Sequence, residues 1–106
     1  MLLDGLEQMG MADSTVVMFF SDHGEMGSSH GRFQKCSPYA ESLRVPWLMR
    51  LPGVLPAGAS IDQPANLIDI FPTSATLCGV PLPDHVQGLD LTPAAESGDT
   101  APRTAP

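Results

Sequence analysis

Two kinds of hydrophobic pattern follow one another in the first half of the chain. Between residues 2 and 9, apolar side chains recur every three or four positions, which predicts a short helix that ends at Gly10. Residues 15–20 are a continuous apolar run, rich in β-branched and aromatic side chains. Such a run directly after a helix predicts a strand buried on both faces, as in a parallel α/β sheet. Residues 43–51 are a second apolar run, in which Pro46 limits any strand to a short one because proline cannot donate a ladder hydrogen bond.

Residues 66–78 predict a further helix. Asp69 can act as its N-cap, Pro72 suits the first turn, and Gly79 follows as a stop. Four apolar positions of this helix could cover the sheet, namely Ile70, Phe71, Ala75 and Leu77. Helices that alternate with buried strands indicate an α/β fold.

The C-terminal segment has a different composition. From Thr92 onward the chain is mainly Ala, Pro, Thr, Ser, Gly and Asp, with almost no large apolar side chain. This composition is typical of disorder, because too little apolar surface is available for burial. We therefore expect one partial domain over residues 1–91 and a disordered tail over residues 92–106.

The charge balance excludes several classes of protein. The 106 residues include 12 acidic and 5 basic side chains, a net charge of −7, whereas a nucleic-acid-binding domain normally carries a basic patch. No apolar run approaches the roughly 20 residues of a membrane-spanning helix. Residues 1–5 lack the features of a signal peptide. The sequence does not identify the cellular compartment. Cys36 and Cys78 lie far apart without C-x-x-C spacing, which supports neither a zinc site nor a disulfide framework.

The polar segment after the first predicted strand carries the candidate chemistry. Asp22 and His23 follow the strand directly, and ligand sites in open α/β sheets gather at the carboxyl ends of strands. A carboxylate beside an imidazole is half of a metal site, and Gly24 would let the backbone turn sharply under the pair. His30 and Lys35, the only lysine, could donate to an anion near the metal. Such side chains are also ordinary hydrogen-bonding groups of loops, and the residues alone leave both interpretations open.

An ordered series of motifs extends from this segment through the rest of the chain. It comprises S-D-H-G-E-M at 21–26, H-G-R at 30–32 with Lys35, Y-A-E-S-L-R-V-P at 39–46, R-L-P-G at 50–53, D-I-F-P-T at 69–73, C-G-V-P at 78–81 and G-L-D-L at 88–91. The series strongly resembles the sulfatase family of the alkaline-phosphatase-like superfamily of metal-dependent hydrolases. The resemblance covers residues 2–93, and the order of the motifs makes it far more specific than any one of them.

The resemblance implies an α/β fold, specifically an incomplete part of an alkaline-phosphatase-like sheet covered by helices, and metal-dependent hydrolysis of sulfate esters. It assigns Asp22 and His23 as ligands of a divalent cation, usually calcium, with magnesium as the second candidate. It assigns His30 and Lys35 as catalytic and substrate-binding residues that contact the sulfate oxygens and the leaving group. These roles agree with the need for cations and a proton donor around a sulfate ester during cleavage.

The sequence also departs from the family pattern. Sulfatases use a formylglycine made from Cys or Ser in a C-x-P/A-x-R motif, together with two upstream aspartates. Cys36-Ser37-Pro38 begins like that motif, but position 40 is Ala and the segment lies downstream of the metal pair. Glu41 and Arg44 match the family as scaffold residues in polar pairs. We therefore expect an internal-to-C-terminal piece of a catalytic domain that is inactive alone.

Two alternatives accompany the sulfatase interpretation. A phosphonate or phosphate ester hydrolase of the same superfamily would use the same Asp-His pair and the following His. A truncated, non-catalytic product acting as an interaction module is favoured by the missing nucleophile. Because the apolar strand at 16–20 needs neighbours on both sides, we also expect the isolated chain to self-associate.

Overall fold

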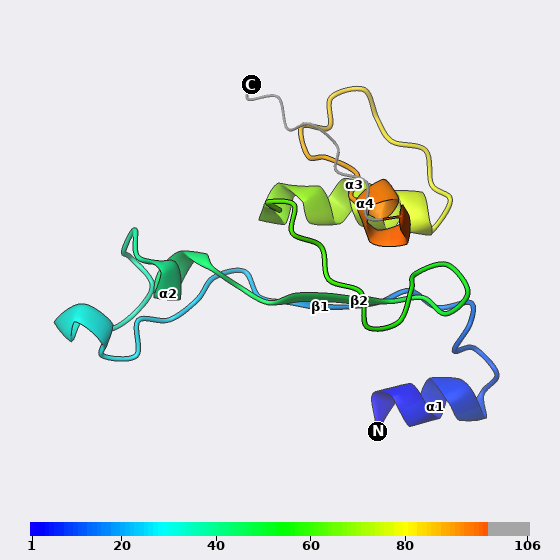
Figure 1. The fold of residues 1–106 in the computed structure, drawn as a ribbon, viewed down its shortest axis with the longest axis horizontal. Coiled ribbons are helices and arrows are strands. Elements are labelled where there is room, and N and C mark those ends of the chain that lie inside the picture. The colour runs from blue at the N-terminus through cyan, green and yellow to red at the C-terminus, as the bar shows by residue number, and fades with distance from the viewer. Residues whose placement is uncertain (98–106) are drawn as a thin grey trace. The chain divides into compact units, whose positions relative to one another are not determined.

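The computed structural model describes residues 1–97, which form short helices and one small sheet (Figure 1). The regular elements in chain order are α1 (Leu2–Gln8), β1 (Val17–Phe20), the 3-10 turn η1 (Ser29–Gly31), α2 (Ala40–Leu43), β2 (Trp47–Arg50), the 3-10 turn η2 (Leu67–Asp69), α3 (Ile70–Leu77) and α4 (Thr92–Ser97). The chain divides into two compact units. One unit is residues 18–49, and the other joins residues 1–17 to the described residues from 50 onward.

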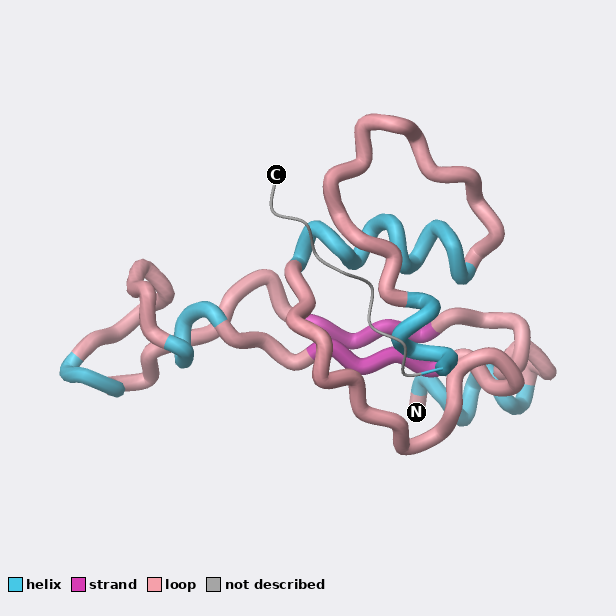
Figure 2. Tube along the Cα trace, turned by 45° about the horizontal axis from the view of Figure 1, so that its top comes forward, coloured by secondary structure: helices cyan, strands magenta, loops and turns pink. Residues whose placement is uncertain are grey.

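The sheet consists of β1 and β2, which lie side by side (Figure 2). Both strands meet the connecting segment 21–46 at the same end of the sheet, so they run antiparallel. β2 begins directly after Pro46, as the lack of a proline N–H requires. β1 begins at Val17, two positions later than the start of the apolar run.

The burial of β1 differs from the prediction of a strand covered on both faces in a parallel sheet. Its Phe19 side chain is 62% exposed and Phe20 is 44% exposed, and Leu48 on β2 is 63% exposed. Among residues 1–97 the sheet has only two strands. A buried parallel strand needs a neighbouring strand on each side and helices over both faces of the sheet. The exposed aromatic side chains are the physical basis for the expected self-association.

The unit of residues 18–49 is organised around a closed loop. The backbone N–H of Met26 donates to the Gln34 carbonyl at 3.2 Å, and the Gln34 N–H donates to the Glu25 carboxylate at 2.6 Å. These bonds close the segment between residues 26 and 34, and the Met26 side chain is buried. The predicted loop at 21–39 is therefore an ordered loop that contains η1.

The second unit is organised around a buried carboxylate at the start of α3. Asp69 is 0% exposed, and its two carboxylate oxygens accept from the backbone N–H groups of Asn66 at 2.7 Å and Leu89 at 2.8 Å. Thr73, one turn later, accepts from the Leu91 N–H at 3.0 Å. Residues 89–91 are thus tied to α3 through polar groups of the D-x-x-x-T pattern.

The helix predicted at 66–78 is confirmed as η2 followed by α3, with Gly79 in the left-handed region at φ +68° after the last turn. Its apolar face was predicted only in part. Ala75 is buried as expected, whereas Phe71 is 55% exposed and the buried face instead includes Pro72 and Thr73. This face packs against α4 and the 89–91 segment.

The C-terminal prediction needs a correction at its start. Residues 92–97 were assigned to the disordered tail, but they form α4, with Ala94 and Ala95 buried. Alanine is the best helix former, and proline is tolerated in the first helical turn, so Pro93 does not oppose this helix. The remainder of the expected tail, residues 98–106, lies outside the described residues.

The predicted N-terminal helix is confirmed as α1, which ends before Gly10. Its Glu7 carboxylate lies 3.8 Å from the Arg50 guanidinium, which also donates to the Ala12 carbonyl at 3.4 Å. These contacts join the α1 segment to the end of β2. None of the helices within residues 1–97 has the length and apolar character needed to span a bilayer.

We predict that Asp69→Asn destabilises the chain by about 1–3 kcal/mol, because an amide nitrogen on a buried side chain would face one of the two N–H donors that the carboxylate now satisfies. Asp84→Asn, in an exposed turn, is the matched control and should change stability by less than about 0.5 kcal/mol. Urea unfolding followed by circular dichroism measures both. Equal midpoints for the two variants would contradict a structural role of the Asp69 carboxylate.

Candidate active site

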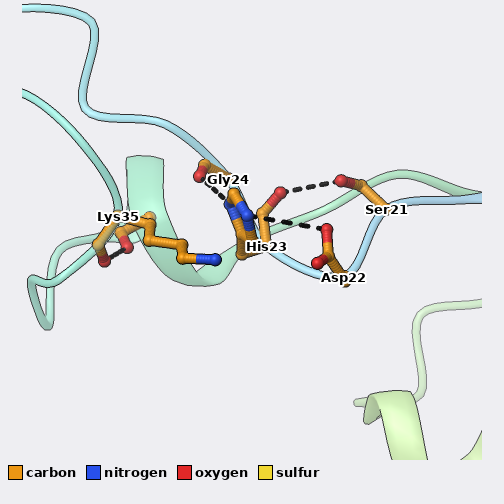
Figure 3. Close-up of polar contacts among 6 residues, drawn as sticks. Ser21, Asp22, His23, Gly24 and Lys35 are labelled. Atoms are coloured by element: carbon orange, nitrogen blue, oxygen red, sulfur yellow. Dashed lines mark hydrogen bonds and ion pairs between the residues drawn. The ribbon is translucent and has the colours of Figure 1, made fainter.

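The candidate residues Asp22 and His23 lie in the turn that follows β1, within the unit of residues 18–49. The Ser21 hydroxyl donates to the His23 carbonyl at 2.7 Å and thereby fixes the backbone of this turn (Figure 3). The structure therefore places both residues at the carboxyl end of a strand, where the sequence pattern located them.

The side chains of Asp22 and His23 face each other. The Nδ1 atom of His23 lies 2.7 Å from the Gly24 carbonyl, and its Nε2 atom lies 3.7 Å from Oδ1 of Asp22 (Figure 3). A carbonyl oxygen can only accept, so Nδ1 carries the proton of this hydrogen bond. A neutral His23 therefore presents the lone pair of Nε2 beside a carboxylate oxygen. A backbone carbonyl bound to the far nitrogen is the usual support of a metal-ligating histidine.

Gly24 is required here by close packing. A Cβ atom at this position would collide with the backbone carbonyl of Glu41, and the Gly24 N–H donates to the Ser42 carbonyl at 2.8 Å. The sequence prediction gave Gly24 the role of permitting a sharp turn. Its φ is not among the positive values of the chain, so the reason for glycine is the approach of α2.

His30 lies on η1 and has a left-handed backbone at φ 53°, which is uncommon for a residue other than glycine. Its ring stacks on the Tyr39 ring, with centroids 4.0 Å apart and an interplanar angle of 11°. Its Nε2 atom lies 3.6 Å from the Glu41 carboxylate. The predicted polar pair of Glu41 is therefore formed with His30.

Lys35 is exposed and is held through its backbone. Its carbonyl accepts a hydrogen bond from the Ser42 hydroxyl, and in Figure 3 its side chain extends toward His23. The structure thus brings Asp22 and His23 into direct contact, whereas His30 contacts Tyr39 and Glu41. Sequence reasoning missed Ser42, because a buried serine in a short helix has no distinctive pattern.

The donor set fits part of a cation site. Two atoms that bind one cation at about 2.0–2.6 Å lie roughly 3–4 Å apart, which matches the 3.7 Å between Nε2 of His23 and Oδ1 of Asp22. The Asp22 side chain is 82% exposed and so can be reached by an ion. Within residues 1–97 no group of three His, Cys, Asp or Glu side chains could hold a metal. Because calcium takes six to eight oxygen ligands, the pair supplies only a part of a calcium shell.

Comparison with known proteins identifies the family of this chain. The sequence profile of the sulfatase family matches residues 1–80. Human arylsulfatase K is 40% identical over 88 residues, which are 83% of this chain and 16% of that protein. The chain therefore spans about one sixth of the length of this curated relative.

Solved structures agree with this assignment. A protein in complex with its substrate D-glucosamine-2-N,6-O-disulfate has a TM-score of 0.87 and 34% identity, covering 95% of this chain and 20% of that one. The phosphonate monoester hydrolase of Agrobacterium radiobacter has a TM-score of 0.84 and 34% identity, covering 93% of this chain and 20% of that one. The predicted fold class, an incomplete α/β part of an alkaline-phosphatase-like fold, is confirmed.

We predict that Gly24→Ala destabilises the unit of residues 18–49 by about 1–3 kcal/mol, because its Cβ displaces the Glu41 carbonyl and strains the bond to Ser42. Fluorescence of Trp47, the only tryptophan, reports unfolding of this unit. The control is Gly5→Ala in α1, where a Cβ meets nothing within 4 Å. A Gly24→Ala variant with the wild-type Trp47 transition would show that α2 is not packed on this turn.

Proposed function

The chain belongs to the sulfatase family, and we propose that it supplies the metal-binding and leaving-group residues of a sulfuric ester hydrolase. The observation that carries the proposal is the contact between Asp22 and His23. These side chains turn a carboxylate oxygen and an imidazole nitrogen toward one another at 3.7 Å, and the Gly24 carbonyl fixes the histidine tautomer. This arrangement favours the interpretation as a cation-binding pair over that as an ordinary hydrogen-bonded loop.

Asp22 and His23 would hold a divalent cation, and calcium is our first candidate, with magnesium second. A bound divalent cation supplies positive charge that polarises the ester and its attacking group. The residues of this chain determine where that charge sits, because the Ser21 hydroxyl and the Gly24 carbonyl orient the pair. The exposed Asp22 carboxylate leaves room for ligands from elsewhere.

His30 and Lys35 would act on the sulfate ester itself. The Lys35 ammonium is an exposed cation on a side chain that extends toward His23, so it can neutralise a sulfate oxygen next to the cation site (Figure 3). His30 would contact the leaving-group side and donate a proton to the departing oxygen, which would otherwise leave as an alkoxide. Both residues would therefore be catalytic and substrate-binding residues.

The family nucleophile has no match among the cysteines of this sequence. Cys36 and Cys78 are exposed and unpaired with each other, and neither stands in a C-x-P/A-x-R motif. No step is assigned to either residue. We accordingly propose that these 106 residues do not hydrolyse sulfate esters by themselves.

A phosphonate ester hydrolase is the second candidate function. The specific observation in its favour is the phosphonate monoester hydrolase of Agrobacterium radiobacter, whose structure matches this chain with a TM-score of 0.84. A phosphonate monoester is also an anion that needs a metal and cationic donors. The sulfatase profile and the arylsulfatase relatives favour the sulfate ester.

Segment exchange tests this proposal. We expect human arylsulfatase K, with its 88-residue matching segment replaced by that of this chain, to hydrolyse an aryl sulfate. Lys35→Ala in the hybrid should lower kcat/KM by about 10²–10³-fold, the usual loss for one donor to a developing oxyanion. Arg32→Ala, an exposed cation three positions earlier, should stay within a few-fold.

Two controls accompany the exchange. The isolated chain should hydrolyse the aryl sulfate no faster than its own Lys35→Ala variant. The reciprocal hybrid is built in the phosphonate monoester hydrolase of Agrobacterium radiobacter. Turnover by that hybrid alone would favour the second function, and inactivity of both hybrids would overturn the assignment of these residues.

We further predict that calcium raises the stability of the isolated chain by less than about 0.4 kcal/mol, the value of RT ln 2 when the ion concentration does not exceed Kd. Two protein ligands rarely hold calcium. Thermal unfolding with and without the ion measures this, and Asp22→Asn is compared with Asp84→Asn. A large shift that only Asp22→Asn removes would mean that the chain, or a second copy of it, completes the ligand set.

A further inference from the structure

The short helix α2 and its N-cap Tyr39 contact the His30 side chain and the backbone of Gly24 and Lys35, although the proposed function uses none of their side chains. At its N-terminal end, Tyr39 and Glu41 contact the His30 side chain. In its interior, the buried Ser42 donates through its hydroxyl to the Lys35 carbonyl and accepts from the Gly24 N–H through its own carbonyl. One short segment therefore contacts His30, the backbone of Lys35 and the residue that follows His23.

The contacts of Tyr39 and Glu41 restrict the two torsions of the His30 side chain. Stacking at 4.0 Å and 11° restricts the plane of the imidazole. The Glu41 carboxylate, 3.6 Å from Nε2, restricts which edge of the ring faces α2. An ionised carboxylate can only accept, so it favours a proton on Nε2 and leaves Nδ1 on the opposite edge.

The backbone around His30 is strained in the same region. The non-glycine residues with positive φ in residues 1–97 are Ser28, His30 and Gln34, all within the loop that the bonds of Gln34 close. Such conformations are energetically unfavourable for residues other than glycine and persist where surrounding contacts impose them. The stack and the carboxylate contact are the side-chain contacts that hold His30 in this conformation.

We propose that Tyr39 and Glu41 are positioning residues of His30, which hold its ring so that Nδ1 is the nitrogen open to the substrate. The proposal rests on the proposed function only in naming that substrate, a sulfate ester. The backbone of Glu41 packs on Gly24. Glu41 therefore links the orientation of His30 to the turn that carries Asp22 and His23. With Nε2–H directed at Glu41, His30 donates a proton from Nδ1 to the leaving oxygen when its ring carries both protons, and the ring is then neutral with its remaining proton on Nε2.

Long-range ¹H–¹⁵N NMR of the imidazole rings in the full 106-residue chain tests the proposal without turnover. In the wild type, neutral His30 should carry its proton on Nε2, and its carbon-bound ring protons should show the upfield shift of a stacked ring. Tyr39→Leu should abolish the upfield shift, and Tyr39→Phe should retain it because the ring is kept. Glu41→Ala should bring Nδ1-protonated tautomer into the spectrum, and Glu41→Gln, which keeps an acceptor oxygen, should largely restore the wild-type state.

The chain contains an internal reference for these spectra. His85, exposed in the other unit, should give the same signals in all variants. Unstacked His30 shifts in the wild type, or a wild type with the proton on Nδ1, would overturn the proposal. Unchanged His30 signals in both Tyr39→Leu and Glu41→Ala would overturn it equally. Failure of the hybrid enzymes with intact His30 signals would instead contradict the proposed function alone.

Discussion

The packing of α2 on Gly24 is the constraint on which the candidate site depends. The missing Cβ lets the Glu41 carbonyl approach the Asp22–Gly24 turn, and the bond from the Gly24 N–H to the Ser42 carbonyl fixes the approach at 2.8 Å. From this contact the positions of Glu41 and Ser42 follow, and from them those of the His30 ring and the Lys35 backbone. Because these bonds are short-range and directional, a change at Gly24 is transmitted to residues that are distant from it in sequence.

The two units rely on different physical means to order their loops. In residues 18–49 the loop is closed by a backbone bond between Met26 and Gln34 and by the Glu25 carboxylate, which accepts from the Gln34 N–H, and the Met26 side chain is buried. In the other unit a buried carboxylate and a threonine hydroxyl bind backbone groups twenty and eighteen positions away. Polar groups of this kind specify one arrangement of the backbone, because a shifted segment would leave buried N–H groups without acceptors.

The sequence predicted local structure well because local structure depends on neighbours in the chain. The helix before Gly10, the strand after Pro46 and the helix ending before Gly79 follow from propensity and backbone geometry. The predictions were wrong for the burial of Phe71 and Phe19 and for the start of the tail at residue 92. Burial depends on which distant segments of the chain pack against a residue, and the local sequence does not determine this. α4 illustrates this, because its alanines are buried by α3 rather than by any pattern of their own.

For the candidate site, the motif series identified the residue types but not their contacts. Asp22 and His23 are adjacent in sequence, so their pairing could be predicted, and the structure shows it. Contacts across the loop could not be predicted. The carboxylate near His30 belongs to Glu41, eleven positions later, and glycine is needed at position 24 because the α2 backbone approaches it. The spacing of residues in a motif does not show which backbone segments pack against one another.

The exposed face of the sheet and the small number of ligands at the proposed cation site are consistent with one physical reason. A TM-score of 0.87 is reached over 95% of this chain and only 20% of the matched structure, so the equivalent strands there belong to a much larger fold. In a larger sheet, strands beside β1 and β2 would cover side chains such as Phe19 and Leu48, which are exposed within residues 1–97. The same strands would end at the edge where Asp22 and His23 lie, and they could supply further ligands to the proposed cation there.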